Sequence, residues 1–456
     1  MSEERESLAA FVAAAADEFG VPGAAVAVLA GGAEHHVTHG VTNVDHPLPI
    51  DEHTLFPLAS VSKSFTATAL LRLVEQGAVD LDAPVRRYVP ELCLADEEAA
   101  ARITVLNLLN HTSGLDWNLV DADETDGSLA AWVAQLDRLP LIAPPGARAS
   151  YSQAGYNLAG LVVEKVTGLP FEKAVAELVL EPLGLSDTVY DLDEVVIRRF
   201  AVGHNRAEDG TVTLARPWKS WRAGTRGNNP GGGIVSSASD LLRWARFQLS
   251  DGEGLLTAAS LDRMKRPTVQ LRGSTLGDAF GICWFLRDVA GVRTVGHGGS
   301  GNGQFAELLL VPERDFAVVS LANTGPDGYQ FNQAVLKRAL ELYLGVVERE
   351  PEPLPYDAGR AREAAGRYEI DAMCLDVTDE AGRLTLAVGI KPEIRAASDA
   401  EMPPDYPAAE IGFLPGEGDE YVITEGGLKG QKGYFSRGAD GAVTGVDLAG
   451  RLFSRR

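Results

Sequence analysis

The sequence predicts an α+β protein: an antiparallel sheet flanked by helices with a helical subdomain, followed by a small C-terminal all-β barrel domain. Three observations predict this. Strand-like runs lie at residues 23–40 and again at 304–321, and helix-like segments fill the chain between them. Beyond a proline-rich stretch, short runs alternate with turn residues. Since a sheet must bury its apolar face, we expect the first two groups of strands to share one sheet covered by helices.

The chain has 456 residues, 45% of them hydrophobic and 23% charged, which is typical of a soluble globular protein. This length exceeds one ordinary core and predicts two or three domains. Residues 348–355 are acidic and rich in proline, a composition that favours an extended linker. We therefore expect a first domain at 1–346, a linker at 347–360 and an all-β domain at 361–456.

The elements of the first domain follow from periodicity and from their stop signals. Residues 1–20 are typical of an acidic amphipathic helix, and 23–30 with 34–40 of a hairpin. Apolar residues recur at the helical period in 59–77 and 157–167, where Gly77 and Gly168 are expected to end the helices. Further segments are a helix at 236–249 whose Ser237 to Asp240 fits a capping box, a hairpin of 304–311 with 316–321, and a helix at 332–344.

The tail carries short apolar runs at 384–388, 420–424, 433–436 and 443–448, separated by glycine, aspartate and proline. Even spacing of short strands predicts a small barrel or sandwich.

Charge and composition exclude several classes of function. The formal net charge of −23 argues against nucleic acid or an anionic membrane as a partner. No apolar stretch is long enough to span a bilayer, and the first residues lack the pattern of a signal peptide. If the first methionine is genuine, we expect a cytoplasmic protein. Three widely spaced cysteines predict neither a disulfide framework nor a zinc site.

Ser60 and Lys63 form the most informative pair in the chain. They lie three residues apart at the start of the helix predicted over 59–77 and so share one face. A serine hydroxyl needs a neighbouring base to become a nucleophile, and a lysine serves when burial or nearby cations lower its pKa. The same spacing also occurs where a serine only caps a helix. The remaining clusters decide between these two interpretations.

Two such clusters follow. Tyr151 to Asn157 form a polar stretch before a helix, in which the Tyr151 hydroxyl is a candidate general base or proton relay. Residues 296–303 match G-x-G-x-x-G, but a strand follows them where a dinucleotide site needs a helix. Glycines at a strand edge instead let a substrate backbone approach, and His297 is placed to interact with an acyl group or with Tyr151.

The histidines at residues 35, 36 and 39 are the candidates for a metal site. Alternation along a strand points the first two to opposite faces, and no carboxylate or cysteine stands at ligand spacing. We expect neither a metal nor an organic cofactor.

Together these residues resemble the serine β-lactamase and penicillin-binding-protein superfamily, in particular its class C-like branch of esterases, D-aminopeptidases and β-lactamases. The motif S-x-x-K falls on Ser60 to Lys63, Y-x-N on Tyr151 to Gln153, and K-T-G or H-x-G on His297 to Gly299. Residues 108–115 and 231–237 also resemble the family, over about 8–345 in all. The tail is similar to the lipocalin-like barrel behind some D-amino-acid hydrolases and stand-alone peptide cyclases.

The resemblance implies an acyl-enzyme mechanism. Ser60 would attack a carbonyl, with Lys63 and Tyr151 moving its proton to the leaving group. The backbone N–H groups of Ser60 and Ser300 would form the oxyanion hole. Gln153, Gly298 and Gly299 would contact the substrate, and His297 would complete the catalytic set.

Two departures from the family pattern matter for the substrate. Gln153 stands where asparagine is usual, and His297 replaces the lysine of true β-lactamases and can be neutral at pH 7, which weakens capture of a carboxylate. The sequence therefore predicts a serine acyl-hydrolase or acyltransferase for small esters or amides, including peptides with D-residues. A β-lactamase or D,D-carboxypeptidase, a peptide cyclase of penicillin-binding-protein type, and a non-catalytic sensor or scaffold remain alternatives. The partner is a small-molecule or peptide substrate, and a homo-oligomer is allowed.

Overall fold

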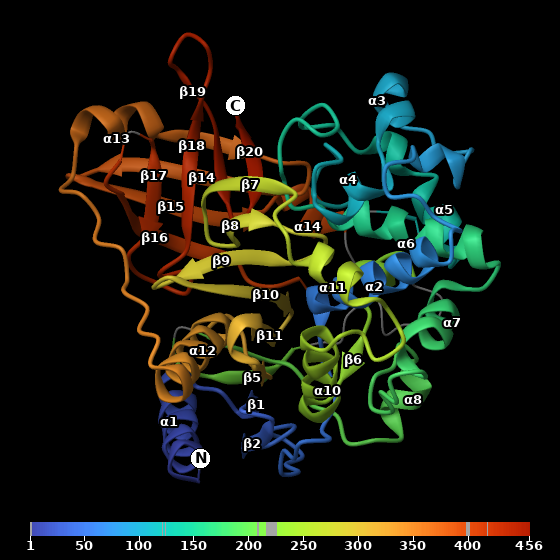
Figure 1. The fold of residues 1–456 in the computed structure, drawn as a ribbon. Coiled ribbons are helices and arrows are strands. Elements are labelled where there is room, and N and C mark those ends of the chain that lie inside the picture. The colour runs from blue at the N-terminus through green and yellow to red at the C-terminus, as the bar shows by residue number, and fades with distance from the viewer. Residues whose placement is uncertain are drawn as a thin grey trace.

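The molecule consists of an α+β domain, in which helices flank an antiparallel sheet, and of a closed β-barrel (Figure 1). The computed structural model describes residues 2–120, 122–123, 125–207, 209–215, 226–397, 402–416 and 418–456. No helix in these described ranges is both long enough and apolar enough to cross a bilayer.

The first domain is built on an eight-stranded antiparallel sheet of order β2-β1-β12-β11-β10-β9-β8-β7. β1 pairs with β12, with Val26 opposite Ser320, so strands from both ends of the domain share one sheet as predicted. All eight residues of β1 are buried, as expected for a central strand covered on both faces. The strands are β1 Gly23–Ala30, β2 Ala33–Gly40, β7 Val269–Ser274, β8 Gly277–Phe280, β9 Phe285–Val289, β10 Val292–Gly301, β11 Gln304–Val311 and β12 Phe316–Ala322.

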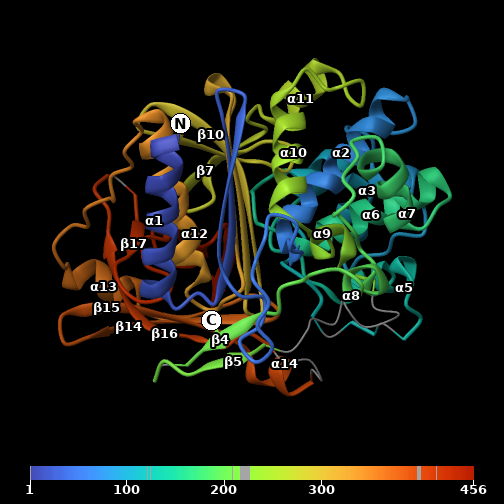
Figure 2. The same cartoon turned by 90° about the horizontal axis from the view of Figure 1, so that it is seen from below.

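Helices cover both faces of this sheet (Figure 2). α1 (Ser2–Phe19) and α12 (Gly328–Leu344) pack together on one face around a shared apolar core. α2 (Ser62–Glu75) and α10 (Ala238–Leu249) lie on the other, where a larger core extends into the helical subdomain.

The helical subdomain lies between β2 and β7 in sequence. Its helices are α3 Glu97–Arg102, α4 Val105–Leu109, α5 Leu129–Val133, α6 Gln153–Thr167, α7 Phe171–Val175, α8 Leu192–Val196, α9 Asn229–Gly232 and α11 Ala258–Met264. Single turns are η1 Ala59–Val61, η2 Val85–Arg87, η3 Leu136–Arg138, η4 Ala176–Leu180 and, between β11 and β12, η6 Pro312–Arg314. Two small ladders pair β3 (Phe56–Pro57) with β6 (Val235–Ser236) and β4 (His204–Arg206) with β5 (Val212–Leu214).

Capping residues explain where the structure shifts the predicted helix boundaries. α6 begins four residues before the predicted 157, because the Ser152 side chain accepts a hydrogen bond from the Gly155 amide as its N-cap. Ser237 caps α10 in the same way through the Asp240 amide, as its sequence predicts. Gly168 closes α6 in the left-handed conformation, also as predicted.

The C-terminal strands form a closed eight-stranded barrel, in agreement with the predicted all-β tail. They are β13 Gly366–Glu369, β14 Met373–Glu380, β15 Arg383–Ile390, β16 Tyr406–Phe413, β17 Glu420–Ile423, β18 Lys432–Arg437, β19 Val443–Leu448 and β20 Arg451–Arg455. Two helices, α13 (Ala358–Ala364) and α14 (Pro392–Ala397), accompany them. An apolar cluster, which includes Tyr368, Tyr421 and Phe435, fills the barrel core and takes in Ala361 and Ala364 of α13.

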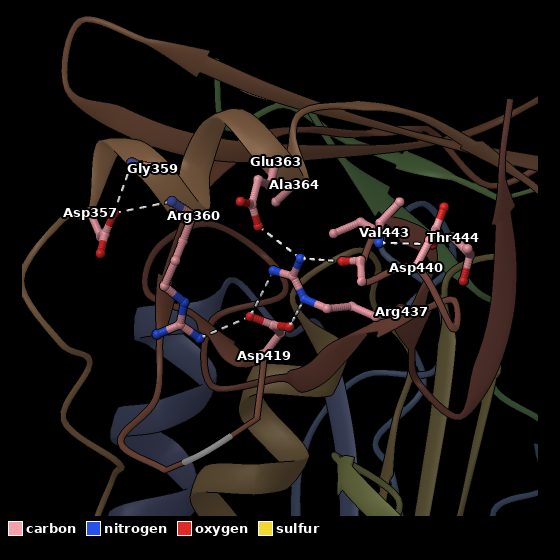
Figure 3. Close-up of polar contacts among 12 residues, drawn as sticks. Asp357, Gly359, Arg360, Glu363, Ala364, Asp419, Arg437, Asp440, Val443 and Thr444 are labelled. Atoms are coloured by element: carbon pink, nitrogen blue, oxygen red, sulfur yellow. Dashed lines mark hydrogen bonds and ion pairs between the residues drawn. The ribbon is translucent and has the colours of Figure 1, made fainter.

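Ion pairs hold α13 on the barrel (Figure 3). The Arg437 guanidinium of β18 lies 2.6 Å from Asp419 and 2.8 Å from Glu363 of α13. Arg360 of the same helix donates to Asp419 and lies over the Phe413 ring. Asp357 caps α13 by accepting hydrogen bonds from the amides of residues 359 and 360.

Several hydrogen bonds dock the barrel on the first domain, among them those of Thr275, Asp116 and Tyr151. Thr275, in the β7–β8 turn, exchanges hydrogen bonds with the backbone of Lys432 in β18. The Asp371 amide donates to the Asp116 carboxylate over 2.9 Å. The β19–β20 turn also contacts the first domain, where the Gly450 carbonyl accepts a hydrogen bond of 2.7 Å from the Tyr151 amide. A barrel turn therefore lies directly beside a predicted catalytic residue.

Candidate active site

Ser60 lies in a tight turn just before α2. It belongs to the 3₁₀ turn η1, and the preceding Ala59 has a positive φ of 45°, a strained backbone conformation for a residue with a side chain. The serine is partly exposed and lines a cavity of about 210 Å³ together with Tyr151, His297 and the glycines of β10. The predicted nucleophile is thus open to this cavity.

Lys63 lies one turn further along and is fully buried. Its Nζ is 3.1 Å from the Ser60 Oγ, 2.5 Å from Oε1 of Gln153 and 2.7 Å from the Gly231 carbonyl oxygen. The last two atoms can only accept hydrogen bonds. Burial lowers the pKa of Lys63 well below its usual value, and the nearby Arg451 lowers it further.

The hydrogen bonds of Gln153 fix the orientation of its amide. Its Nε2 donates to Oδ1 of Asn157 at 3.1 Å and to the Asn228 carbonyl oxygen at 3.3 Å. Both partners accept, so Oε1 must be the atom that faces Lys63. Gln153 is the first residue of α6. It is not among the described residues that line the cavity. Its predicted contact with substrate stays a prediction, whereas its contact with the lysine is direct.

Tyr151 contacts both Ser60 and Lys63. Its hydroxyl shares a hydrogen bond with Ser60, and its ring centre is 5.1 Å from Nζ of Lys63. Burial raises the pKa of Tyr151 well above its usual value, and this effect exceeds the lowering by the Ser60 hydrogen bond and by the Arg451 charge. The side chain is accordingly a neutral phenol at pH 7.

His297 lies in β10, near the point where β9 ceases to pair with it. Its Nδ1 is 2.7 Å from the Gly298 carbonyl oxygen, and its ring stacks on Phe285 at 4.2 Å between ring centres. Burial and the Lys63 charge lower the pKa of His297 to about 3, so the ring is neutral. With the single proton on Nδ1, Nε2 is left as an acceptor, and it is buried without a hydrogen-bond partner among the described residues.

The glycines of β10 allow this strand to pass against the nucleophile. A Cβ on Gly299 would lie 3.0 Å from the Ser60 amide nitrogen and 2.1 Å from the Leu58 carbonyl oxygen. Gly298, Gly299 and Ser300 all line the cavity. The backbone of the predicted oxyanion-hole residues, Ser60 and Ser300, therefore borders the same space.

Arg451 is the site residue that sequence reasoning missed. It is the first residue of β20 in the barrel, lines the cavity, and holds its guanidinium carbon 4.9 Å from the Tyr151 ring centre and 5.3 Å from that of Trp117. Its Nη1 donates to the Ala449 carbonyl oxygen at 3.2 Å, and its Nε is buried without a hydrogen-bond partner among the described residues. No local motif marks this arginine, because 300 residues separate it from the tyrosine that it faces.

His111 packs against Tyr151 and binds the backbone next to it. Its Nδ1 accepts a hydrogen bond of 3.1 Å from the Ser152 amide, and its ring lies 4.3 Å from that of Tyr151 between centres. Burial lowers the pKa of His111 well below its usual value, so it too is neutral.

Comparisons with known proteins agree with this geometry. Residues 8–341 match the family model described as Beta-lactamase. Penicillin-binding protein 4 of Amycolatopsis lactamdurans is 32% identical over 369 residues, which are 77% of this chain and 94% of that protein. Esterase EstB of Burkholderia gladioli is 31% identical over 349 residues, or 67% of this chain and 86% of the esterase.

The crystal structure of SurE resembles the whole molecule, barrel included. It has a TM-score of 0.75 at 27% identity and covers 100% of this chain and 99% of its own, and a SurE structure with D-Leu has a TM-score of 0.72 at 26% identity and covers 100% of both chains. The chain therefore belongs to the Beta-lactamase family and is an enzyme of the serine-hydrolase type.

Proposed function

We propose that the protein is a serine acyl-hydrolase or acyltransferase that forms an acyl-enzyme on Ser60. Its substrates are small esters or amides, including peptides with D-residues. The family supports serine-hydrolase chemistry in general, and the assignment of Ser60, Lys63, Tyr151 and His297 to this chemistry is our proposal.

The hydrogen bonds of Lys63 carry the proposal. A neutral amine has two N–H bonds and one lone pair, and the Gln153 and Gly231 oxygens require both N–H bonds. The lone pair is then left for the Ser60 hydroxyl at 3.1 Å. Burial favours this neutral form by lowering the pKa of the lysine. The arrangement supports Lys63 as the base that activates the nucleophile.

The acylation step follows from these positions. Ser60 Oγ attacks the carbonyl carbon of the substrate, its proton moves to Lys63, and the carbonyl π electrons move to the oxygen. The tetrahedral intermediate then collapses and expels the leaving group, which receives the proton from Lys63 through the Tyr151 hydroxyl. A neutral phenol suits this relay, because it donates one proton while it accepts another.

The oxyanion of the intermediate would be held by the Ser60 and Ser300 amides. Donors directed at a charge that develops only in the transition state lower its free energy by roughly 3–4 kcal/mol each. Deacylation repeats the sequence with water or an amine as the nucleophile. D-configured substrates are favoured because SurE, which is similar over its full length, has been crystallised with D-Leu.

The neutral imidazole of His297 argues against the β-lactamase and D,D-carboxypeptidase alternatives. A family lysine at this place would present a cation to a substrate carboxylate, whereas His297 presents an uncharged acceptor. Turnover of a chromogenic cephalosporin faster than that of simple nitrophenyl esters would reverse this choice.

Intact-mass measurement after incubation with a fluorophosphonate and with nitrophenyl esters tests the proposal. Wild type and the exposed-serine control Ser186→Ala should each gain one adduct, and Ser60→Ala none. Lys63→Met should slow acylation by about 10²–10⁴-fold, the usual contribution of a general base. An equal adduct on Ser60→Ala, or none on wild type, would reject the proposal. L- and D-configured amino-acid nitroanilides then measure stereochemical preference.

A further inference from the structure

The catalytic cavity continues beyond Ser60 to the opposite side of β10. Consecutive residues of a strand face opposite sides of the sheet. Gly299 faces Ser60, whereas a Cβ on Gly298 would lie 2.5 Å from Oε1 of Glu307 in the adjacent strand β11. Both glycines and Glu307 line the same cavity. A substrate bound at the serine can therefore extend round the strand edge to this carboxyl group.

The Glu307 carboxyl group is incompletely satisfied by the protein. Its Oε1 accepts a hydrogen bond of 3.2 Å from Nε2 of Gln333, and the carboxyl group makes no other hydrogen bond to the described residues. Arg287 also lines this end of the cavity, but its guanidinium is ion-paired with Glu348. Burial raises the pKa of Glu307 to about 8, although Gln333 and Arg287 both oppose that effect.

Two phenols border the same end of the cavity. Tyr329 comes from α12 and Tyr406 from β16 of the barrel. Burial raises the pKa of Tyr329 above its usual value and that of Tyr406 to about 12, so both are neutral. They offer hydroxyl oxygens and electron-rich ring faces, and neither takes part in the proposed acyl transfer.

We propose that Glu307, Tyr329 and Tyr406 form a subsite that binds a protonated primary amine of the substrate. A carboxylate with open acceptor capacity and two aromatic rings is the combination that recognises an ammonium group. An apolar chain would bury the Glu307 carboxyl group without a further hydrogen-bond partner. This inference rests on the proposed function of Ser60, because only then does the bound amine belong to a substrate.

Binding of an amine at this position should release a proton. The groups that act on Glu307 are Arg287 from β9 and Gln333 and Tyr329 from α12. Tyr406 of the barrel interacts in turn with Tyr329. An added ammonium stabilises the carboxylate and lowers its pKa, so the carboxyl group loses its proton when the cation binds near pH 7. Affinity for the cation should accordingly increase from pH 6 to pH 8.5.

Equilibrium binding of butylammonium chloride and of butan-1-ol tests the subsite without any turnover. Calorimetry on wild type and on Ser60→Ala should show the ammonium bound at least about tenfold more tightly than the alcohol. Proton release should appear as an observed enthalpy that varies with the ionisation enthalpy of the buffer. Glu307→Gln retains an acceptor for Gln333 and should abolish both the preference and the proton release. The exposed-carboxylate control Glu313→Gln should retain both. Equal affinities in wild type, or a preference that survives in Glu307→Gln, would overturn the inference.

Two pairs of nitrophenyl esters then locate the amine within the substrate. N-acetyl-lysine is compared with N-acetyl-norleucine for a side-chain ammonium, and free norleucine with N-acetyl-norleucine for an α-ammonium. A higher kcat/KM for the charged member of either pair, reduced in Glu307→Gln to the value of its neutral partner and retained in Glu313→Gln, supports the subsite. Turnover of all esters without such a preference rejects the subsite and leaves the proposed function intact.

Discussion

Oε1 of Gln153 makes the shortest hydrogen-bond contact of the Lys63 amine. Gln153→Glu would place a carboxylate at this position and stabilise the ammonium form. We expect the pKa of Lys63 to rise and the acid limb of the kcat/KM profile to move to higher pH. At any pH below the pKa of Lys63, each unit of that movement lowers the rate by about tenfold, because only the free amine is a base.

Profiles measured from pH 5 to pH 10 with a nitrophenyl ester check this expectation. Gln270→Glu adds the same charge at an exposed position of β7 and serves as the control. Its profile should match that of wild type. An unmoved midpoint in Gln153→Glu would show that Lys63 does not set the acid limb.

The sequence predicted only the local half of this arrangement. Ser60 and Lys63 are three residues apart on one helix face, so their contact follows from helical geometry alone. The Gly231 carbonyl and Arg451 lie 168 and 388 positions beyond Lys63, and nothing in their own segments indicates that they meet the catalytic residues. Neutral His297 was foreseen as an option, but burial had to be known before the direction of its pKa could be stated.

At the scale of elements, β10 and η1 approach so closely that a side chain at Gly299 has no room. An added methyl group would overlap the Leu58 carbonyl oxygen at 2.1 Å, which is backbone and cannot rotate away. We expect Gly299→Ala to lower the free energy of unfolding by about 1–3 kcal/mol, the usual cost of overpacking. Acylation of Ser60 should fall with it, because the strand and the nucleophile must separate.

Gly155→Ala is the matched control within α6. A Cβ there would meet neighbours only at 3.6 Å, an ordinary contact. The substitution should leave the protein as stable as wild type or stabilise it by up to about 1 kcal/mol, since alanine is the better helix former. Denaturant unfolding and ester hydrolysis measure both variants. Wild-type stability and activity in Gly299→Ala would contradict the proposed fit of β10 to the nucleophile turn.

Two segments whose structure the sequence pattern did not predict carry residues of the site. The sequence predicts a polar stretch at residues 151–157 before the helix, yet Gln153 and Asn157 both belong to α6 and are buried and hydrogen-bonded at the site. The glycine-rich end of β10 has low strand propensity, but its pairing with β11 makes it a strand. The hairpin of β11 and β12, which carries no site chemistry beyond Glu307, was predicted almost to the residue.

At the scale of the whole molecule, the barrel completes the catalytic cavity of the first domain. Arg451 and Ala449 in the β19–β20 turn, together with Tyr406 and Gln431, line that cavity from the barrel side. Burial cannot be assigned to such a turn from sequence, because its partners belong to another domain. The position of this turn should therefore affect acyl transfer even though none of its residues takes the proton.

Gly450 allows this claim to be tested with a closely matched pair. Gly450 and Gly441 both have a positive φ, 72° and 81°, in adjoining hairpin turns of the barrel. A Cβ on Gly450 would lie 2.5 Å from the Leu276 side chain across the domain contact, whereas a Cβ on Gly441 would meet nothing within 4 Å. Alanine at either position should cost a similar 1–2 kcal/mol or so of backbone strain.

Only Gly450→Ala should also displace the turn whose carbonyl holds the Tyr151 amide. A displacement of about 1 Å in catalytic groups can lower kcat/KM by up to about 10²-fold. We therefore expect a clear loss of ester hydrolysis in Gly450→Ala and near-wild-type rates in Gly441→Ala, at matched thermal stability. Near-wild-type rates in both variants would mean that the barrel turn covers the cavity without positioning Tyr151. An equal loss of rate in both variants would mean that the effect comes from the stability of the barrel alone.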